Sequence, residues 1–168
     1  MSEGDPADLR ERVVRARTRL EGIPAIGAGE PGPPDPETGE RWTRLHVLGH
    51  TAEMLPFWCA QVRGVLAGGE WIGRGEGGYE MRQAAIDAGA AGDEADLRAR
   101  VGAGVDDLLS LLDEAGGSDV SREVEYRGLT ETETESIGSL IERRLVRHLE
   151  SHVEQLEELT PGERDDGA

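Results

Sequence analysis

The chain has only one cysteine, Cys59, among its 168 residues, so it cannot close an internal disulfide. Cys59 shares an apolar stripe with Leu55 and Val62, a setting that favours a buried thiol over a reactive thiolate. Basic residues are also few, because 18 Lys and Arg stand against 35 Asp and Glu for a formal net charge of -17. A surface of this sign repels phosphate backbones and anionic lipid headgroups. We therefore expect no nucleic-acid partner and no membrane partner.

Long apolar runs are missing as well. No stretch of the sequence is long enough to span a bilayer, and the first residues, which include Asp5, Arg10 and Arg12, lack the apolar run of a signal peptide. We therefore expect a soluble, cytoplasmic protein. A chain of 168 residues suits one core of ordinary size. We expect a single domain over residues 1–159 and a mobile polar tail over residues 160–168.

Apolar residues recur at intervals of three and four in four separate segments, as in amphipathic helices with one buried face. Thr132, followed three residues later by Glu135, offers a capping box for the last of these helices. The predicted helices lie near residues 7–21, 41–67, 93–115 and 132–159. The predicted core includes Leu20, Leu55, Val62, Val105, Leu112, Leu145 and Leu156. This pattern predicts an all-α protein, a four-helix bundle with a long connection between its first two helices.

Proline and glycine interrupt the helical pattern in two places. The connection from Gly22 to Gly39 carries five prolines, which exclude a helix or a central strand. We expect residues 24–37 to touch the core sparingly. The connection from Gly68 to Gly78 does not follow a strand pattern, so its glycines do not form a nucleotide-binding fingerprint. Residues 120–126 have the pattern of one short extended segment, and one strand makes no sheet.

Two of the four histidines, His148 and His152, fall within the apolar face of the predicted last helix. Their i, i+4 spacing stacks the rings on adjacent turns, so that their nitrogens can converge on one metal ion. A third ligand must come from another helix. His50 lies in a second apolar arc of the 41–67 helix, with His46 at its edge and Glu53 just beyond, and the helical wheel alone does not choose among them. The alternative is that carbonyls, carboxylates or water satisfy these buried rings.

Two short motifs resemble a known family. The segment Trp42–His50 reads Trp-Thr-Arg-Leu-His-Val-Leu-Gly-His, and the segment Arg147–His152 reads Arg-His-Leu-Glu-Ser-His. Both resemble motifs of the DinB-like bundle proteins, which include bacillithiol transferases and the metal-binding domain of mycothiol-dependent maleylpyruvate isomerases. In helix order the likeness covers most of residues 7–159, although its specific motifs occupy only these two stretches.

The resemblance implies a ligand set. The run from Leu48 to Trp58, with Gly73, Arg74 and Arg82 downstream, is similar to an uncharacterised branch of that superfamily. By the resemblance, His50, His148 and His152 bind one divalent metal ion, with Zn²⁺ or Ni²⁺ expected, while His46 is not required. Three-histidine sites accept several divalent ions, so the sequence alone does not identify the metal.

The same resemblance implies a function. We expect a metal-dependent enzyme that activates a low-molecular-weight thiol such as mycothiol, as an S-transferase or isomerase does. An alternative reaction is hydrolysis by a metal-bound hydroxide, with Glu53 as the candidate catalytic proton acceptor. A second class of function is a non-catalytic bundle that binds a metal or ligand, with a homodimer as one possible assembly.

Arg74 and Arg82 are candidates for binding an anionic small-molecule substrate or cofactor. The alternative is that they pair with nearby carboxylates, namely Glu76, Glu80 or Asp87. The three tryptophans are among only six aromatic residues, and we expect them to anchor the core and loops instead of forming a substrate platform.

Overall fold

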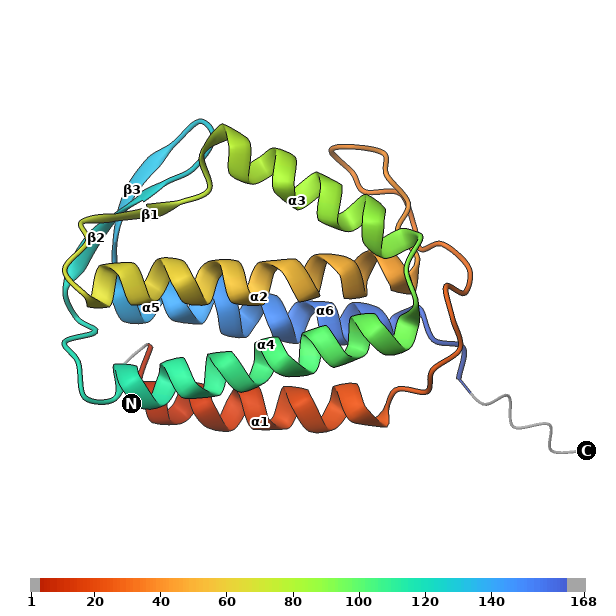
Figure 1. Cartoon of the computed structure of the whole chain (residues 1–168), viewed down its shortest axis with the longest axis horizontal. Coiled ribbons are helices and arrows are strands. Elements are labelled where there is room, and N and C mark those ends of the chain that lie inside the picture. Colours follow the sequence, from red (N-terminus) through yellow and green to blue (C-terminus); the bar gives the residue numbers. More distant parts are fainter. Residues whose placement is uncertain (1–3, 163–168) are drawn as a thin grey trace, which may run out of the picture.

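The computed structural model describes residues 4–162, in which four long helical segments form a bundle (Figure 1). They are α1 (Pro6–Gly22), α2 (Arg44–Leu66), α4 (Glu94–Ala115) and a last helix composed of α5 (Ile137–Ile141), η1 (Glu142–Val146) and α6 (Arg147–Glu158). The predicted all-α bundle is therefore confirmed. No helix of the described part has the length and apolar character needed to cross a membrane.

The core forms where the helical periodicity places it. Asp5 caps α1 by accepting a hydrogen bond from the backbone N–H of Ala7, and Asp93 caps α4 by accepting one from Asp96. Cys59 is fully buried, and burial followed by the charge of Asp107 raises the pKa of its thiol to about 12. All seven residues predicted for the core are buried, with 8% or less of each exposed: Leu20, Leu55, Val62, Val105, Leu112, Leu145 and Leu156.

The last helix starts later than the sequence predicted and contains a π-turn. Ser136 caps it by accepting from the N–H of Ser139, so the helix begins at Ile137 and the predicted start near residue 132 is wrong. Within η1, the N–H of Arg147 donates to the carbonyl of Glu142, five residues earlier. A π-turn inserts an extra residue into the helix, which rotates the following face by roughly 100°. The two ends of this helix therefore present different registers to the core.

A small sheet at one end of the bundle contradicts the expectation that no sheet forms. Strands β1 (Trp71–Gly73), β2 (Glu123–Arg127) and β3 (Thr132–Ser136) lie in the order β1-β2-β3, with β1 parallel and β3 antiparallel to β2. Strand β2 buries alternate side chains, Val124 and Tyr126. Strand β3 buries none, so pairing with β2 holds it in place.

An additional helix, α3 (Gly75–Ala90), lies over α2 (Figure 1). The helices predicted from the sequence did not include this segment. Gly49 and Gly89 bring the two helices together, because a Cβ atom built on Gly49 would lie 2.7 Å from the Cα of Gly89. Ile86 of α3 is also buried, with only 1% of it exposed. This close contact makes α3 a wall beside the N-terminal half of α2.

The long connection between α1 and α2 touches the core sparingly, as predicted. Pro33 and Pro34 are exposed. The connection is nevertheless anchored by Arg44, which is fully buried and which the sequence analysis did not single out. Its guanidinium donates to the carbonyls of Pro24 and Gly27. The connection is therefore fastened to the start of α2.

Arg44 has two further partners. It forms an ion pair with Glu94 of α4 (2.8 Å) and donates to the hydroxyl of Thr160. Thr160 is thus held against the bundle, although it was expected to begin the mobile tail. The remainder of that predicted tail from residue 163 lies outside the described residues.

Candidate metal centre

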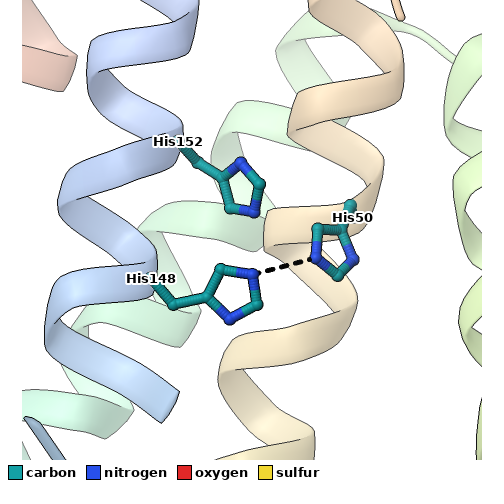
Figure 2. Close-up of side chains that lie close together, drawn as sticks. All are labelled: His50, His148 and His152. Atoms are coloured by element: carbon teal, nitrogen blue, oxygen red, sulfur yellow. Dashed lines mark hydrogen bonds between the residues drawn. The ribbon is translucent and has the colours of Figure 1, made fainter. Parts of the chain in front are cut away.

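Three histidine rings from two helices face one another inside the bundle (Figure 2). His50 comes from α2, while His148 and His152 come from successive turns of α6. One nitrogen from each ring can be chosen so that all three lie within 4.8 Å of one another. The structure therefore brings together the three histidines that the sequence singled out, at a spacing that one metal ion could bridge.

The spacing and the bonding state of the nitrogens fit a metal ion. The Nε2 atoms of His50 and His148 are 3.2 Å apart. Two nitrogens bound to one tetrahedral zinc at about 2.0–2.1 Å are roughly 3.3 Å from each other. The buried Nδ1 of His50 and Nε2 of His152 have no hydrogen-bond partner in the described chain. Because buried polar atoms rarely remain unpaired, Nε2 of His152 indicates a missing partner. Nδ1 of His50 instead faces Glu53 at 3.8 Å, and the nitrogen of His50 that faces His148 is Nε2.

The electrostatic surroundings keep all three rings neutral. Burial, followed by the nearby charges of the other two histidines, lowers the pKa of His50 to about 2. Burial and then His152 lower the pKa of His148 to about 3, against an opposing hydrogen bond with the backbone of Arg144. Burial lowers the pKa of His152 to about 4. Neutral imidazoles keep the lone pairs that a metal ion requires, so protons do not compete for the site at neutral pH.

Gln155 orients one of the rings, a role that the sequence analysis missed. Its Oε1 atom lies 3.0 Å from Nδ1 of His152. An amide oxygen can accept a hydrogen bond but cannot donate one. Nδ1 of His152 therefore carries the hydrogen, and its Nε2 carries the lone pair. Such partners fix the tautomer of metal-binding histidines. The available signal was the i, i+3 spacing, which places Gln155 beside His152 on the same helical face.

His46 lies outside this cluster. Its Nδ1 accepts a hydrogen bond from the backbone N–H of Thr43 at 3.1 Å, which caps the beginning of α2. The ring stacks on Trp42, with 6.4 Å between the centroids. His46 therefore has a structural role at the helix terminus.

Glu53 is close to the cluster but is bound to another residue. Both of its oxygens accept from the guanidinium of Arg74, at 2.6 and 2.9 Å. Its Oε2 lies 3.8 Å from Nδ1 of His50, beyond hydrogen-bond distance. Arg74 also stacks on Phe57, 4.2 Å from the ring centroid. The partner of Arg74 is thus Glu53, and not one of the three carboxylates considered from the sequence.

A cavity of about 460 Å³ opens beside the three histidines. Trp42 lines it and touches two of the rings, with centroid distances of 5.6 Å to His50 and 6.4 Å to His152. Trp58 is a core residue, as expected, whereas Trp42 belongs to the site. The cavity is also lined by Arg82 and Gln83 of α3, Gln155 of α6, and residues of the long connection: Gly32, Pro33, Pro34, Asp35, Pro36 and Thr38.

Comparisons with known proteins agree with this architecture. The profile of the DinB superfamily matches residues 5–156, which include every helix described above except the last two residues of α6. The search of curated proteins and the search of solved structures each returned no match. Because the family match spans nearly the whole chain, this protein belongs to the DinB superfamily.

Proposed function

We propose that His50, His148 and His152 bind one divalent metal ion, Zn²⁺ or Ni²⁺. The observation that carries this proposal is the convergence of three neutral imidazoles, one of which, His152, has a buried Nε2 without a partner among the described residues. An ordinary core histidine would have this nitrogen satisfied. Three imidazole ligands also leave at least one coordination position for a substrate, as in catalytic zinc sites.

We further propose that the protein is an enzyme that activates a low-molecular-weight thiol for transfer to an electrophile. A divalent ion at this site would lower the pKa of a bound thiol and so supply a thiolate at neutral pH. The chain contributes a cavity of about 460 Å³ next to the histidines, a volume suited to a small molecule. Trp42 and residues of the long connection line part of this cavity.

The hydrolytic alternative has less support. It requires a free carboxylate to accept a proton from water, and Glu53 was the candidate. Both oxygens of Glu53 are held by Arg74, and the pair is largely buried, with 13% and 4% of the side chains exposed. The oxygen of Glu53 that lies nearest to His50 already accepts a hydrogen bond from Arg74. Activation of a thiol needs no such base, because coordination itself favours the thiolate.

Metal binding is tested by elemental analysis and calorimetric titration of the purified, chelator-treated protein with Zn²⁺ and Ni²⁺. We expect one ion per chain, an increase in melting temperature upon binding, and loss of both effects in His152→Ala. His46→Ala is the matched control, because His46 lies on α2 but outside the cluster. Stoichiometric metal in His152→Ala would refute the three-histidine site.

Catalysis is tested separately with the metal-loaded protein. Mycothiol, bacillithiol and simpler thiols are each mixed with 1-chloro-2,4-dinitrobenzene, and the formation of the thioether is followed by absorbance. We expect turnover that is lost after chelation and in His152→Ala. A fully loaded protein that turns over none of these thiols would instead support the non-catalytic, metal-binding bundle.

A further inference from the structure

Arg82 lies in the wall of the cavity, on the helix that the sequence did not predict. The close contact between Gly49 and Gly89 fixes α3 against α2, and Arg82 is half-buried in the resulting wall. Its Cζ lies 5.9 Å from the centroid of Trp42, and the centroid of Trp42 is 5.6 Å from that of His50. The guanidinium and the ring of His50 therefore lie beside the same indole ring.

Arg82 has no anionic partner of its own. Within residues 4–162 its guanidinium forms no ion pair and no hydrogen bond, and its contact is the face of Trp42. Arg44 and Arg74 are paired, with Glu94 and Glu53 respectively, and Arg41, which forms no ion pair in the described part of the chain, is exposed. In a chain with 35 acidic and 18 basic residues, partners for arginine are abundant. An unpaired, half-buried guanidinium in a cavity wall is therefore available to a ligand.

The surroundings disfavour leaving this charge unpaired. Burial, followed by the like charge of Arg74, lowers the pKa of Arg82. A guanidinium nevertheless stays protonated at neutral pH, so the protein bears the cost of desolvating it. An oxyanion placed against the guanidinium would recover part of this cost through paired, charge-assisted hydrogen bonds.

The acidic residues that line the same cavity are more exposed than Arg82. Asp35, Glu40 and Glu158 are exposed, whereas Arg82 is half-buried beside the rings. Asp35 accepts hydrogen bonds from the backbone of its own turn, and Glu40 accepts one from Nε1 of Trp42 at 3.3 Å. The cavity is therefore negative at its rim and positive inside. This polarity orients an anionic group inward.

We propose that the ligand of this cavity carries an oxyanion, a carboxylate or a phosphate, which Arg82 binds while the rest of the ligand reaches the histidines. The inference rests on the proposed thiol chemistry for the group at the metal, but the oxyanion contact itself depends only on Arg82. The planar guanidinium fork offers two parallel N–H groups to such an anion. The ring of Trp42 lies beside that fork, with its centroid 5.9 Å from Cζ of Arg82.

The test uses the Co²⁺-loaded protein and three matched sets of thiol probes. These are ω-mercaptocarboxylates with two to five methylene groups, their neutral carboxamides, and the corresponding ω-mercaptoalkyl phosphates. Absorbance of the Co²⁺–thiolate pair reports whether sulfur reaches the metal, and calorimetry reports affinity. At the best chain length we expect an anionic probe to bind about tenfold more tightly than its carboxamide. The preferred anion, carboxylate or phosphate, identifies the source of the oxyanion.

Variants assign this preference to one residue. Arg82→Gln should reduce the ratio of affinities to near one while leaving the metal content unchanged, and Arg82→Lys should retain part of it. Arg100→Gln is the control, because it removes the same charge from an exposed position away from this cavity. It should keep the full preference.

The possible failures can be told apart. Equal affinities of anionic and neutral probes in the loaded wild type, or a full preference in Arg82→Gln, would overturn the inference alone. A preference for the anion without a thiolate absorbance band would preserve the role of Arg82 and reject the thiol chemistry. Failure of the wild type to retain metal would reject the metal site itself.

Discussion

At the scale of single residues, the hydrogen bond between Gln155 and His152 is the contact that orients the candidate metal site. Replacing Gln155 with Leu removes the oxygen that accepts the Nδ1 proton of His152. We expect metal affinity to fall by about 10–100-fold, the range found for such supporting contacts. A competition titration with a chromogenic chelator measures the change.

Gln155→Glu is the matched control, since a carboxylate also accepts the proton of Nδ1. It should bind metal at least as tightly as the wild type. If Gln155→Leu and Gln155→Glu weakened binding equally, the effect would come from packing, and the proposed orientation of His152 would be wrong.

Single residues also show how much of the candidate site could be predicted from the sequence. The i, i+4 pair His148 and His152 could be predicted from helical spacing, and the structure confirms that the two rings lie together with His50. The wheel could not choose among His50, His46 and Glu53, and the family motif was needed for that choice. Gln155 was missed because an amide on a helix face has many uses. Arg82 was a candidate from composition, but its lack of a partner is visible only in three dimensions.

At the scale of elements, the packing of α3 on α2 depends on two glycines. A Cβ atom on Gly49 would lie 2.7 Å from the Cα of Gly89, and one on Gly89 would lie 2.5 Å from the Cα of Gly49. Gly49→Ala must therefore push the helices apart, and we expect it to lower the free energy of unfolding by about 1–3 kcal/mol. Urea denaturation, followed by circular dichroism, provides the measurement.

Gly102→Ala in α4 serves as the control, because a Cβ atom there meets nothing within 4 Å. Alanine should stabilise that helix by about 0.5–1 kcal/mol. Should Gly49→Ala also stabilise the protein, the close contact between α2 and α3 would not exist in solution.

Strand β3 and the π-turn in η1 could not be predicted from the sequence, for physical reasons. Strand β3 reads Thr-Glu-Thr-Glu-Ser and buries no side chain, so its residues carried no apolar signal and resembled a helix cap instead. Its strand geometry comes from pairing with β2, and its own residues carry no pattern that predicts this pairing. The π-turn in η1 was equally invisible, because a helical wheel assumes a constant rotation of about 100° per residue.

At the scale of the whole molecule, Arg44 joins segments that are far apart in the sequence. It is fully buried and binds the α1–α2 connection, Glu94 and Thr160. Arg44→Met keeps most of the volume but leaves Glu94 with fewer partners. We expect the free energy of unfolding to fall by about 3–5 kcal/mol, as for other broken buried pairs. Urea denaturation tests this value.

The exposed Arg100 is again the control, and Arg100→Met should change stability by less than about 0.5 kcal/mol. Arg44→Met should also make the connection between residues 24 and 43 easier to cleave in limited proteolysis, because its anchor is lost. A variant that keeps wild-type stability and the wild-type digestion pattern would show that the buried contacts of Arg44 are energetically neutral.

The stability of the whole molecule should depend on pH through the three buried histidines. Burial lowers the pKa of His50, His148 and His152 to about 2, 3 and 4, whereas an unfolded histidine titrates near 6.5. Below pH 6.5 the unfolded chain therefore binds more protons than the folded chain. Stability must rise with pH in this range and fall as the pH drops from 6.5 towards the folded values.

Each additional proton taken up on unfolding contributes a slope of about 1.4 kcal/mol per pH unit once the pH is well below 6.5. For the chelator-treated protein, urea denaturation between pH 7 and pH 5 should thus show a steep loss of stability. His152→Leu removes one of the three titrating groups, so about a third of that slope should disappear. The carboxylate pairs elsewhere are unchanged by this substitution and cancel in the comparison. An identical slope in the wild type and in His152→Leu would mean that His152 titrates alike in the folded and the unfolded chain, so that burial does not lower its pKa.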